Sequence, residues 1–223
     1  MATDGFLRWR EPVARALSRV IPGDVLWFVD TAAPVFALTF DDGPHPGTTP
    51  ELLEVLRRHR AKATFFLIGE RVTAYGDLVE QIVADGHEIA NHLMRDERSV
   101  RLPDDRFRRD LAEVSRRLEA YGPVRWFRPG SGFFTPRMLR SAADHGLRAV
   151  LGTLVADNTR PGDAAIAGDL AASIRPGTIV VLHEGTTHRR GVAATTDELL
   201  STLAARGLTT VTVTGLVESG RRP

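Results

Sequence analysis

The sequence predicts an α/β fold in a single domain. From Pro34 onward, short apolar runs alternate with longer segments of helical periodicity, a pattern typical of parallel strands joined by crossover helices. The length of 223 residues suits one domain with a sizeable core, and no Gly-, Ser- or Pro-rich linker divides the chain. The pattern leaves both a barrel and an open doubly wound sheet possible, and in both the chemistry gathers beyond the carboxyl ends of the strands.

Seven strands are expected in this region, at residues 35–40, 63–67, 87–91, 126–128, 147–152, 178–182 and 209–213. Six helices are expected between them, at residues 50–59, 78–85, 103–121, 136–145, 164–174 and 195–206. Thr49 before Pro50 is a candidate N-cap with proline in the first turn. Gly86, Gly146 and Gly207 are C-terminal stops, and each is soon followed by a predicted strand.

The composition excludes several classes of protein. Hydrophobic residues make up 43% and charged residues 26% of the chain, as in ordinary globular proteins. The net charge of +1 provides no field to attract nucleic acid or an acidic membrane. No apolar stretch approaches the ~20 residues that an integral membrane segment needs. Because the chain has no cysteine, any metal must be held by histidine and carboxylates.

Residues 1–33 are expected to form a helical segment that packs on the domain formed by residues 34–223. Arginines interrupt residues 1–21, which therefore lack the apolar core of a signal peptide, and a cytoplasmic location is expected. The apolar residues recur near helical spacing opposite those arginines, at Phe6, Trp9, Val13, Leu17 and Val20. A basic amphipathic helix on a membrane surface is the alternative.

Polar residues follow five of the predicted strands at or near their carboxyl ends. They are Asp41, Asp42, His92, Arg128, Asp157 and His183. Each motif alone has a structural explanation, since Asp-Asp-Gly-Pro is a common turn sequence and a single histidine after a strand is often structural. Their convergence on one face of the sheet favours a catalytic site.

Residue types in this set suit a metal-dependent hydrolase. Asp42, His92 and Asp96 offer two carboxylates and an imidazole with coordination positions left for water. Zinc would lower the pKa of that water towards ~7, and Asp41 could act as the general base. Asp96 could instead form a salt bridge with a neighbouring arginine.

Two further residues complete the predicted chemistry. Arg128 could hold Asp41 charged and correctly turned. His183 could protonate the leaving group.

Four segments resemble motifs of the polysaccharide deacetylases with a NodB homology domain, carbohydrate esterase family 4. They are residues 39–44 (TFDDGP), 86–92 (GHEIANH), 127–129 (FRP) and 181–183 (VLH). The resemblance implies a distorted (β/α) barrel with about seven parallel strands and metal-dependent hydrolysis of an N-acetyl or similar acyl bond. It also implies that Asp157 orients the acid His183.

The chain departs from the family pattern at three places. Asp96 stands where the second metal-binding histidine is expected, so the metal is zinc or a harder ion such as manganese, with cobalt also possible. In the third motif, residues 128–132 read RPGSG, so the oxyanion contact falls to the backbone of Gly130 and Ser131. Asn158 replaces a tryptophan of the fourth motif, which removes an apolar wall for an acetyl methyl group. Phe133 is one of the few aromatic residues placed to meet a sugar ring.

The function expected from the residues and the resemblance is a deacylase of an N-acetylated sugar or oligosaccharide. The alternatives are an amidase or imidase acting on a non-sugar amide, and a metal-free carbohydrate-binding protein without catalytic activity. No nucleic-acid partner is expected.

Overall fold

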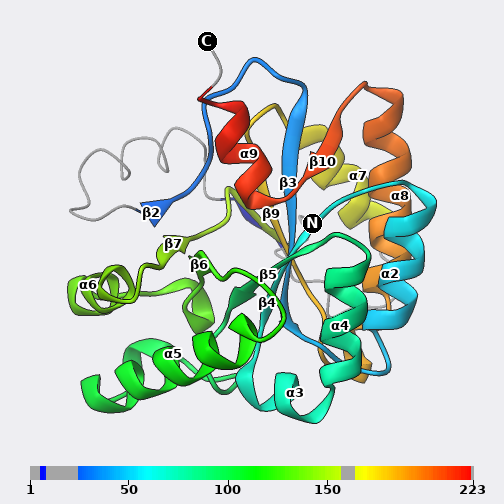
Figure 1. Ribbon diagram of the computed structural model, residues 1–223. Coiled ribbons are helices and arrows are strands. Elements are labelled where there is room, and N and C mark those ends of the chain that lie inside the picture. The colour runs from blue at the N-terminus through cyan, green and yellow to red at the C-terminus, as the bar shows by residue number, and fades with distance from the viewer. Residues whose placement is uncertain (1–5, 9–24, 157–163, 222–223) are drawn as a thin grey trace.

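The computed structural model describes residues 6–8, 25–156 and 164–221. Within them the strands form one sheet, in the order β1–β8–β9–β3–β4–β5–β6–β7–β2, with β10 pairing β3 (Figure 1). The strands are β1 (Phe6–Arg8), β2 (Val25–Leu26), β3 (Val35–Gly43), β4 (Thr64–Leu67), β5 (Glu88–Asn91), β6 (Trp126–Phe127), β7 (Arg148–Val150), β8 (Leu154–Ala156), β9 (Ile179–His183) and β10 (Thr209–Val211). All pairings between these strands are parallel except that of β1 with β8.

Helices surround the curled sheet (Figure 1). They are α2 (Thr49–Arg58), α3 (Gly69–Ala74), α4 (Gly76–Ala84), α5 (Asp104–Glu119), α6 (Pro136–Asp144), α7 (Ala164–Ser173), α8 (Val192–Ala205) and α9 (Val213–Ser219), with short 3₁₀ turns η1 (Ser99–Arg101), η2 (Gly130–Gly132) and η3 (Thr187–Arg189). The predicted α/β class with a distorted, barrel-like parallel sheet is confirmed. No helix in the described part of the chain is long and apolar enough to cross a membrane.

Two elements differ from the expected pattern after Leu147. The strand expected at 147–152 is shorter, and β8 follows it as a separate strand. Between them lies Gly152, where an added Cβ would come within 2.3 Å of Val181 Cγ2. Near the end of the chain, Thr212 Oγ1 accepts a hydrogen bond from Gly215 N at 3.1 Å and caps α9, which replaces the last residue of the expected strand 209–213.

The predicted N-cap of α2 is wrong by one residue. Thr48 occupies the cap position, and its side chain makes no capping hydrogen bond. Instead the hydroxyls of Thr48 and Thr49 donate to Glu184 Oε2 at 2.9 and 2.6 Å. A distant buried carboxyl therefore competes successfully for the hydroxyls that local sequence assigns to the helix end.

Only short parts of the N-terminal segment are described. Phe6–Arg8 is a strand rather than the start of the expected helix, because its backbone pairs with the edge of β8. Val25–Leu26 is a second strand, paired with β7. Residues 27–33 are also described and contain no helix, so this part of the expected helical segment is wrong, and the remainder lies outside the described residues.

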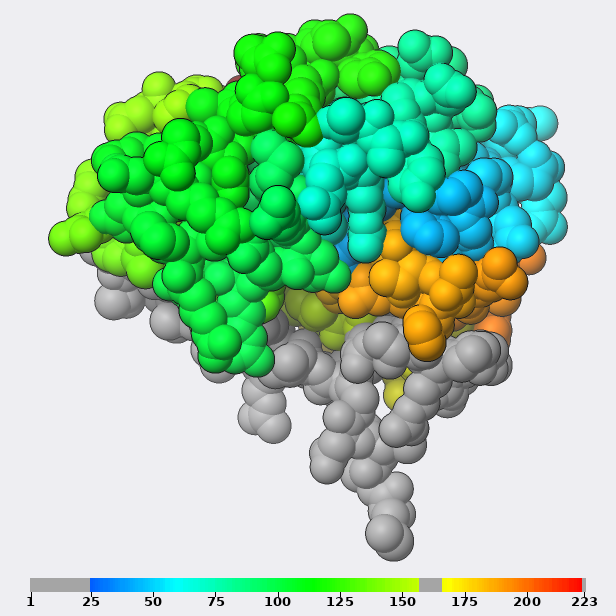
Figure 2. All heavy atoms as spheres, turned by 90° about the horizontal axis from the view of Figure 1, so that it is seen from below, coloured from blue at the N-terminus to red at the C-terminus, as the bar shows by residue number. Residues whose placement is uncertain are grey.

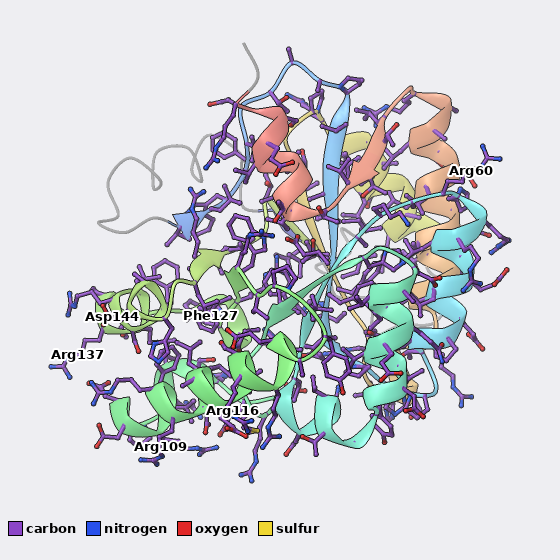
Figure 3. All side chains as sticks on the ribbon, viewed as in Figure 1. Arg60, Arg109, Arg116, Phe127, Arg137 and Asp144 are labelled. Carbon is purple, nitrogen blue, oxygen red and sulfur yellow. The ribbon has the colours of Figure 1, made fainter. Side chains whose placement is uncertain are left out.

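The core lies between the sheet and its surrounding helices. Leu52 and Leu56 of α2 are fully buried with Phe40 of β3, and each such burial contributes about 1.5–3 kcal/mol. Farther along the same face of the sheet, Phe127 packs edge-on against Phe107 of α5 at a centroid distance of 5.7 Å. Figure 3 shows Phe127 inside the molecule, whereas the labelled arginines of α5 and α6 extend outward. This packing fixes the strand ends from which the polar residues project.

Candidate active site

A break in the strand geometry of β3 brings two neighbouring carboxylates to one pocket. Adjacent residues of a regular strand face opposite sides of the sheet. Here Asp42 has a φ of 71°, and the pairing with β4 shifts register between Asp41 and Gly43. Both side chains therefore line the same cavity of about 340 Å³.

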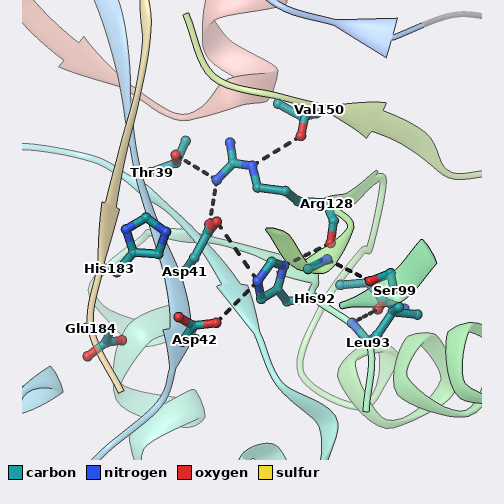
Figure 4. Close-up of polar contacts among 12 residues, drawn as sticks. Thr39, Asp41, Asp42, His92, Leu93, Ser99, Arg128, Val150, His183 and Glu184 are labelled. Carbon is teal, nitrogen blue, oxygen red and sulfur yellow. Dashed lines mark hydrogen bonds and ion pairs between the residues drawn. The ribbon is translucent and has the colours of Figure 1, made fainter. Parts of the chain in front are cut away.

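Asp41 is held by a buried guanidinium. Arg128 Nη1 donates to Asp41 Oδ1 at 2.5 Å and to Thr39 Oγ1 at 2.9 Å, and its Nε donates to Val150 O at 3.1 Å (Figure 4). The guanidinium also stacks 3.9 Å from the ring centroid of Phe66. The structure thus places Arg128 beside the carboxylate that the sequence assigned to it.

Asp42 lies against His92. The distance from His92 Nε2 to Asp42 Oδ1 is 3.3 Å, and His92 Nδ1 lies 2.8 Å from the carbonyl oxygen of Arg128. Nδ1 therefore carries a proton and Nε2 faces the carboxylates (Figure 4). Although burial alone would lower the pKa of His92, the charges of Asp41 and Asp42 raise it overall. Burial would raise the pKa of Asp42, but its hydrogen bond to His92 and the nearby cations hold it below the ordinary value.

The donors in the pocket suit a divalent metal chemically. Asp42 offers a carboxylate oxygen and His92 its Nε2, with Nδ1 fixed by a carbonyl as in many metal-binding histidines. Asp96 lines the same pocket. Within the described residues, however, no three His, Asp or Glu side chains are arranged as a metal-binding group. The structure thus brings Asp42 and His92 together and leaves Asp96 nearby.

His183 comes from the neighbouring strand. It pairs in register with Asp41 and lines the pocket. Its Nδ1 lies 3.2 Å from the carbonyl oxygen of Ala156. Figure 4 shows His183 and His92 on opposite sides of Asp41. Asp157, expected to orient His183, lies outside the described residues.

The loop after β6 forms another side of the pocket. Gly130, Ser131 and Phe133 all line it. The Gly130 N–H donates a hydrogen bond to Ser99 Oγ at 2.7 Å. Of the two backbone N–H groups expected to contact the oxyanion, that of Gly130 therefore already has a partner within the protein. Ser131 has a φ of 66°. Phe133 is 60% exposed at the surface of this loop.

An apolar wall that the sequence did not predict lies on the remaining side. It consists of Trp27, Leu151, Val155 and Val181. Trp27 is only 5% exposed and comes from the segment before β3. Its contribution could not be predicted, because nothing in the local sequence places residue 27 beside the strand ends.

Two charged residues after β9 were also missed. Glu184 is fully buried, and its burial raises its pKa to about 7 despite the hydrogen bonds from Thr49 and Thr48. Arg189 lines the pocket and donates through Nη1 to Asp42 Oδ2 and, at 3.0 Å, to the carbonyl oxygen of Glu184. Figure 2, from below, shows the orange surface of the segment after β9 beside the blue surface of residues that follow β3.

Comparison with known proteins shows the family to which the chain belongs. A family model described as polysaccharide deacetylase matches residues 28–150. The chain belongs to the polysaccharide deacetylase family. It is 34% identical over 200 residues to a peptidoglycan-N-acetylglucosamine deacetylase of Bacillus cereus, and the matched region covers 87% of this chain and 93% of that protein. It is 38% identical to a chitooligosaccharide deacetylase of Rhizobium leguminosarum bv. phaseoli over 70% of each chain.

Solved structures of related proteins have the same fold. A family 4 acetyl xylan esterase from Clostridium thermocellum, solved with a cobalt ion, aligns with a TM-score of 0.76 at 30% identity, over 82% of this chain and 90% of that chain. A family 4 pseudoenzyme from Bacillus anthracis aligns with a TM-score of 0.79 at 26% identity, over 90% of this chain and 71% of that chain. The resemblance to carbohydrate esterase family 4, with its hydrolase class, is confirmed at the level of the polysaccharide deacetylase family.

Proposed function

We propose that this polysaccharide deacetylase family member is a metal-dependent deacetylase of N-acetylated amino-sugar oligosaccharides. The observation that carries the proposal is the buried Asp41–Arg128 pair, with Asp42 and His92 on one side and His183 on the other (Figure 4). Together these residues supply a base, two metal ligands and an acid at a single cavity.

Asp42 and His92 would hold the metal, with Asp96 as a third ligand. Zinc suits this mixture of oxygen and nitrogen donors, and cobalt or manganese would also be accepted. When bound, the metal would act as a Lewis acid and lower the pKa of water towards ~7.

The chain's own side chains would perform the proton transfers. Asp41 would take the proton of the attacking water, while Arg128 balances its charge and fixes its orientation. The N–H of Ser131 would stabilise the oxyanion that forms from the acetyl carbonyl. His183 would donate a proton to the departing amine nitrogen.

The pocket lining supports an acetylated sugar as substrate. Trp27, Leu151 and Val155 present apolar surface of the kind that an acetyl methyl group needs, whereas Asn158, where an apolar wall was expected to be missing, lies outside the described residues. Phe133 would stack on a sugar ring through its exposed face. The Bacillus and Rhizobium relatives are named for deacetylation of peptidoglycan N-acetylglucosamine and of chitooligosaccharide.

Metal-stripped protein reloaded with zinc, cobalt or manganese should release acetate from a panel of chito-oligosaccharides. Asp41→Asn, loaded in the same way, is the matched control and should be nearly inactive. Hydrolysis of small non-sugar amides without release from any sugar would replace this proposal with the amidase alternative. Absence of all activity, together with no retained metal, would favour a non-catalytic role like that of the Bacillus anthracis pseudoenzyme.

A further inference from the structure

We infer that Arg189 competes with the divalent metal for the Asp42 carboxylate and thereby sets the metal affinity of the site. The inference rests on the proposed function and extends it to a residue that sequence reasoning did not assign. In this view Arg189 is an internal counter-cation, which must leave Asp42 before the metal can bind there.

The contacts of Asp42 are the basis for this inference. Its Oδ1 faces His92 Nε2 at 3.3 Å, and its Oδ2 accepts from Arg189 Nη1. Both carboxylate oxygens are therefore engaged by side chains of the protein. The Arg189 side chain is 20% exposed, so the pair is only weakly screened by water.

The charges make this contact and metal binding mutually unfavourable. A guanidinium remains protonated at all physiological pH values, so Arg189 cannot adapt by losing its charge. A divalent ion on Asp42 would lie beside this positive group in a poorly screened pocket. Arg189 must then turn away, and it loses its hydrogen bonds to Asp42 and to Glu184 O.

Asp42 has a second, independent anchor. Arg71 Nη1 donates to the backbone oxygen of Asp42. Gly185, with a φ of 87°, lets the loop after β9 approach closely, since an added Cβ would lie 2.3 Å from the same oxygen. Removing the charge of Arg189 should therefore leave the Asp42 backbone in place and free only its carboxylate.

The neighbouring Arg190 offers a matched control. Its guanidinium points to another site, where it lies 3.7 Å from the position of a Cβ built on Gly47 and, after burial and Arg71, helps to lower the pKa of His45. Arg190→Gln removes the same charge from the same loop but does not touch Asp42.

Calorimetric titration of metal-free protein with zinc or manganese tests the inference. Arg189→Gln should bind the metal at least ~10-fold more tightly than wild type. Arg190→Gln should change the affinity by less than ~2-fold, since screening weakens a more distant charge. Arg189→Lys should restore affinity towards that of wild type. Arg189→Met serves as a second neutral variant if Arg189→Gln fails to fold.

Unchanged or weaker metal binding by the neutral variants would overturn the inference. If wild type nevertheless binds metal and releases acetate, the proposed function stands without it. If wild type binds no metal and Arg189→Gln gains binding, competition by Arg189 is supported in its strongest form. If no variant binds metal, both the inference and the metal-dependent function are wrong.

Discussion

Arg128 and Asp41 form a buried ion pair, in which each residue is 3% exposed and the contact distance is 2.5 Å. Arg128 follows β6 directly and Asp41 lies in β3, so the pair joins two strands through residues that are 87 positions apart in the sequence. It links the predicted base to the core of the sheet. A chain that used Asp41 only as a turn residue would have no need to bury an arginine beside it.

Asp41→Asn should keep the metal and lose ~10²-fold or more in deacetylation rate, because the amide cannot accept the proton of water. Asp42→Ala and His92→Ala should instead abolish metal binding. Elemental analysis and acetate release, measured on the same preparations, separate the two effects. Loss of metal from Asp41→Asn would show that Asp41 is a ligand and not only the base.

Arg128→Met should lower the free energy of unfolding by about 3–5 kcal/mol, because it leaves the Asp41 carboxylate buried without its partner. The double variant with Asp41→Asn should be less destabilised than the sum of the single changes, since no uncompensated charge remains. Urea denaturation of the four proteins measures this coupling. Strict additivity would contradict the pairing.

Asp96→His tests the third ligand. If Asp96 binds the metal, the variant should stay active and shift its preference towards zinc over manganese, because imidazole is a softer donor than carboxylate. Activity after reloading with each metal gives this preference. The same order of metals in both proteins would remove Asp96 from the ligand set.

Glu184→Gln should reduce the loss of stability that occurs as the pH rises. The unfolded carboxyl titrates near pH 4.5, whereas the buried one has a pKa of about 7. The folded state therefore holds the proton longer, and its stability falls between these pH values by about 3 kcal/mol before levelling off. Urea denaturation at pH 5 and pH 8 should show this decrease in wild type.

The exposed Glu198→Gln is the control for this measurement and should keep the full decrease. A wild-type stability that does not fall between pH 5 and pH 8 would mean that Glu184 is already charged in the folded protein.

Phe133→Ala should raise KM for chito-oligosaccharides several-fold, because the sugar loses an aromatic contact that contributes about 1 kcal/mol to binding. We expect little change in kcat or in stability. The side chain is 60% exposed, so its removal leaves no cavity in the core. Val100→Ala, at the other large exposed apolar residue of the described chain, is the control. Steady-state kinetics would contradict the role if KM rose equally in both variants.

Much of the fold and site could be predicted because the polar residues follow strands directly in the sequence. Asp41, His92, Arg128 and His183 are each adjacent to or within a predicted strand, and a parallel sheet brings such ends together. Strand β8 could not be separated from β7, because Gly152 interrupts the run by its packing against Val181 rather than by a turn signal.

The residues that were missed depend on tertiary contacts. Arg189 reaches Asp42 across 147 positions of sequence. Trp27 reaches the pocket from a segment that no motif connects to it. Thr48 and Thr49 bind a carboxyl that is distant in sequence, instead of capping their own helix. Local patterns carry no information about such partners.

The left-handed backbone at Asp42 has a consequence for the evolution of this protein. A side chain other than glycine in that conformation costs on the order of 1 kcal/mol, and glycine would relieve much of it. Selection for folding alone would therefore favour replacement of Asp42, whereas the proposed reaction needs its carboxylate. Lineages that lose the activity should lose this aspartate early, and their proteins should gain thermal tolerance as they do.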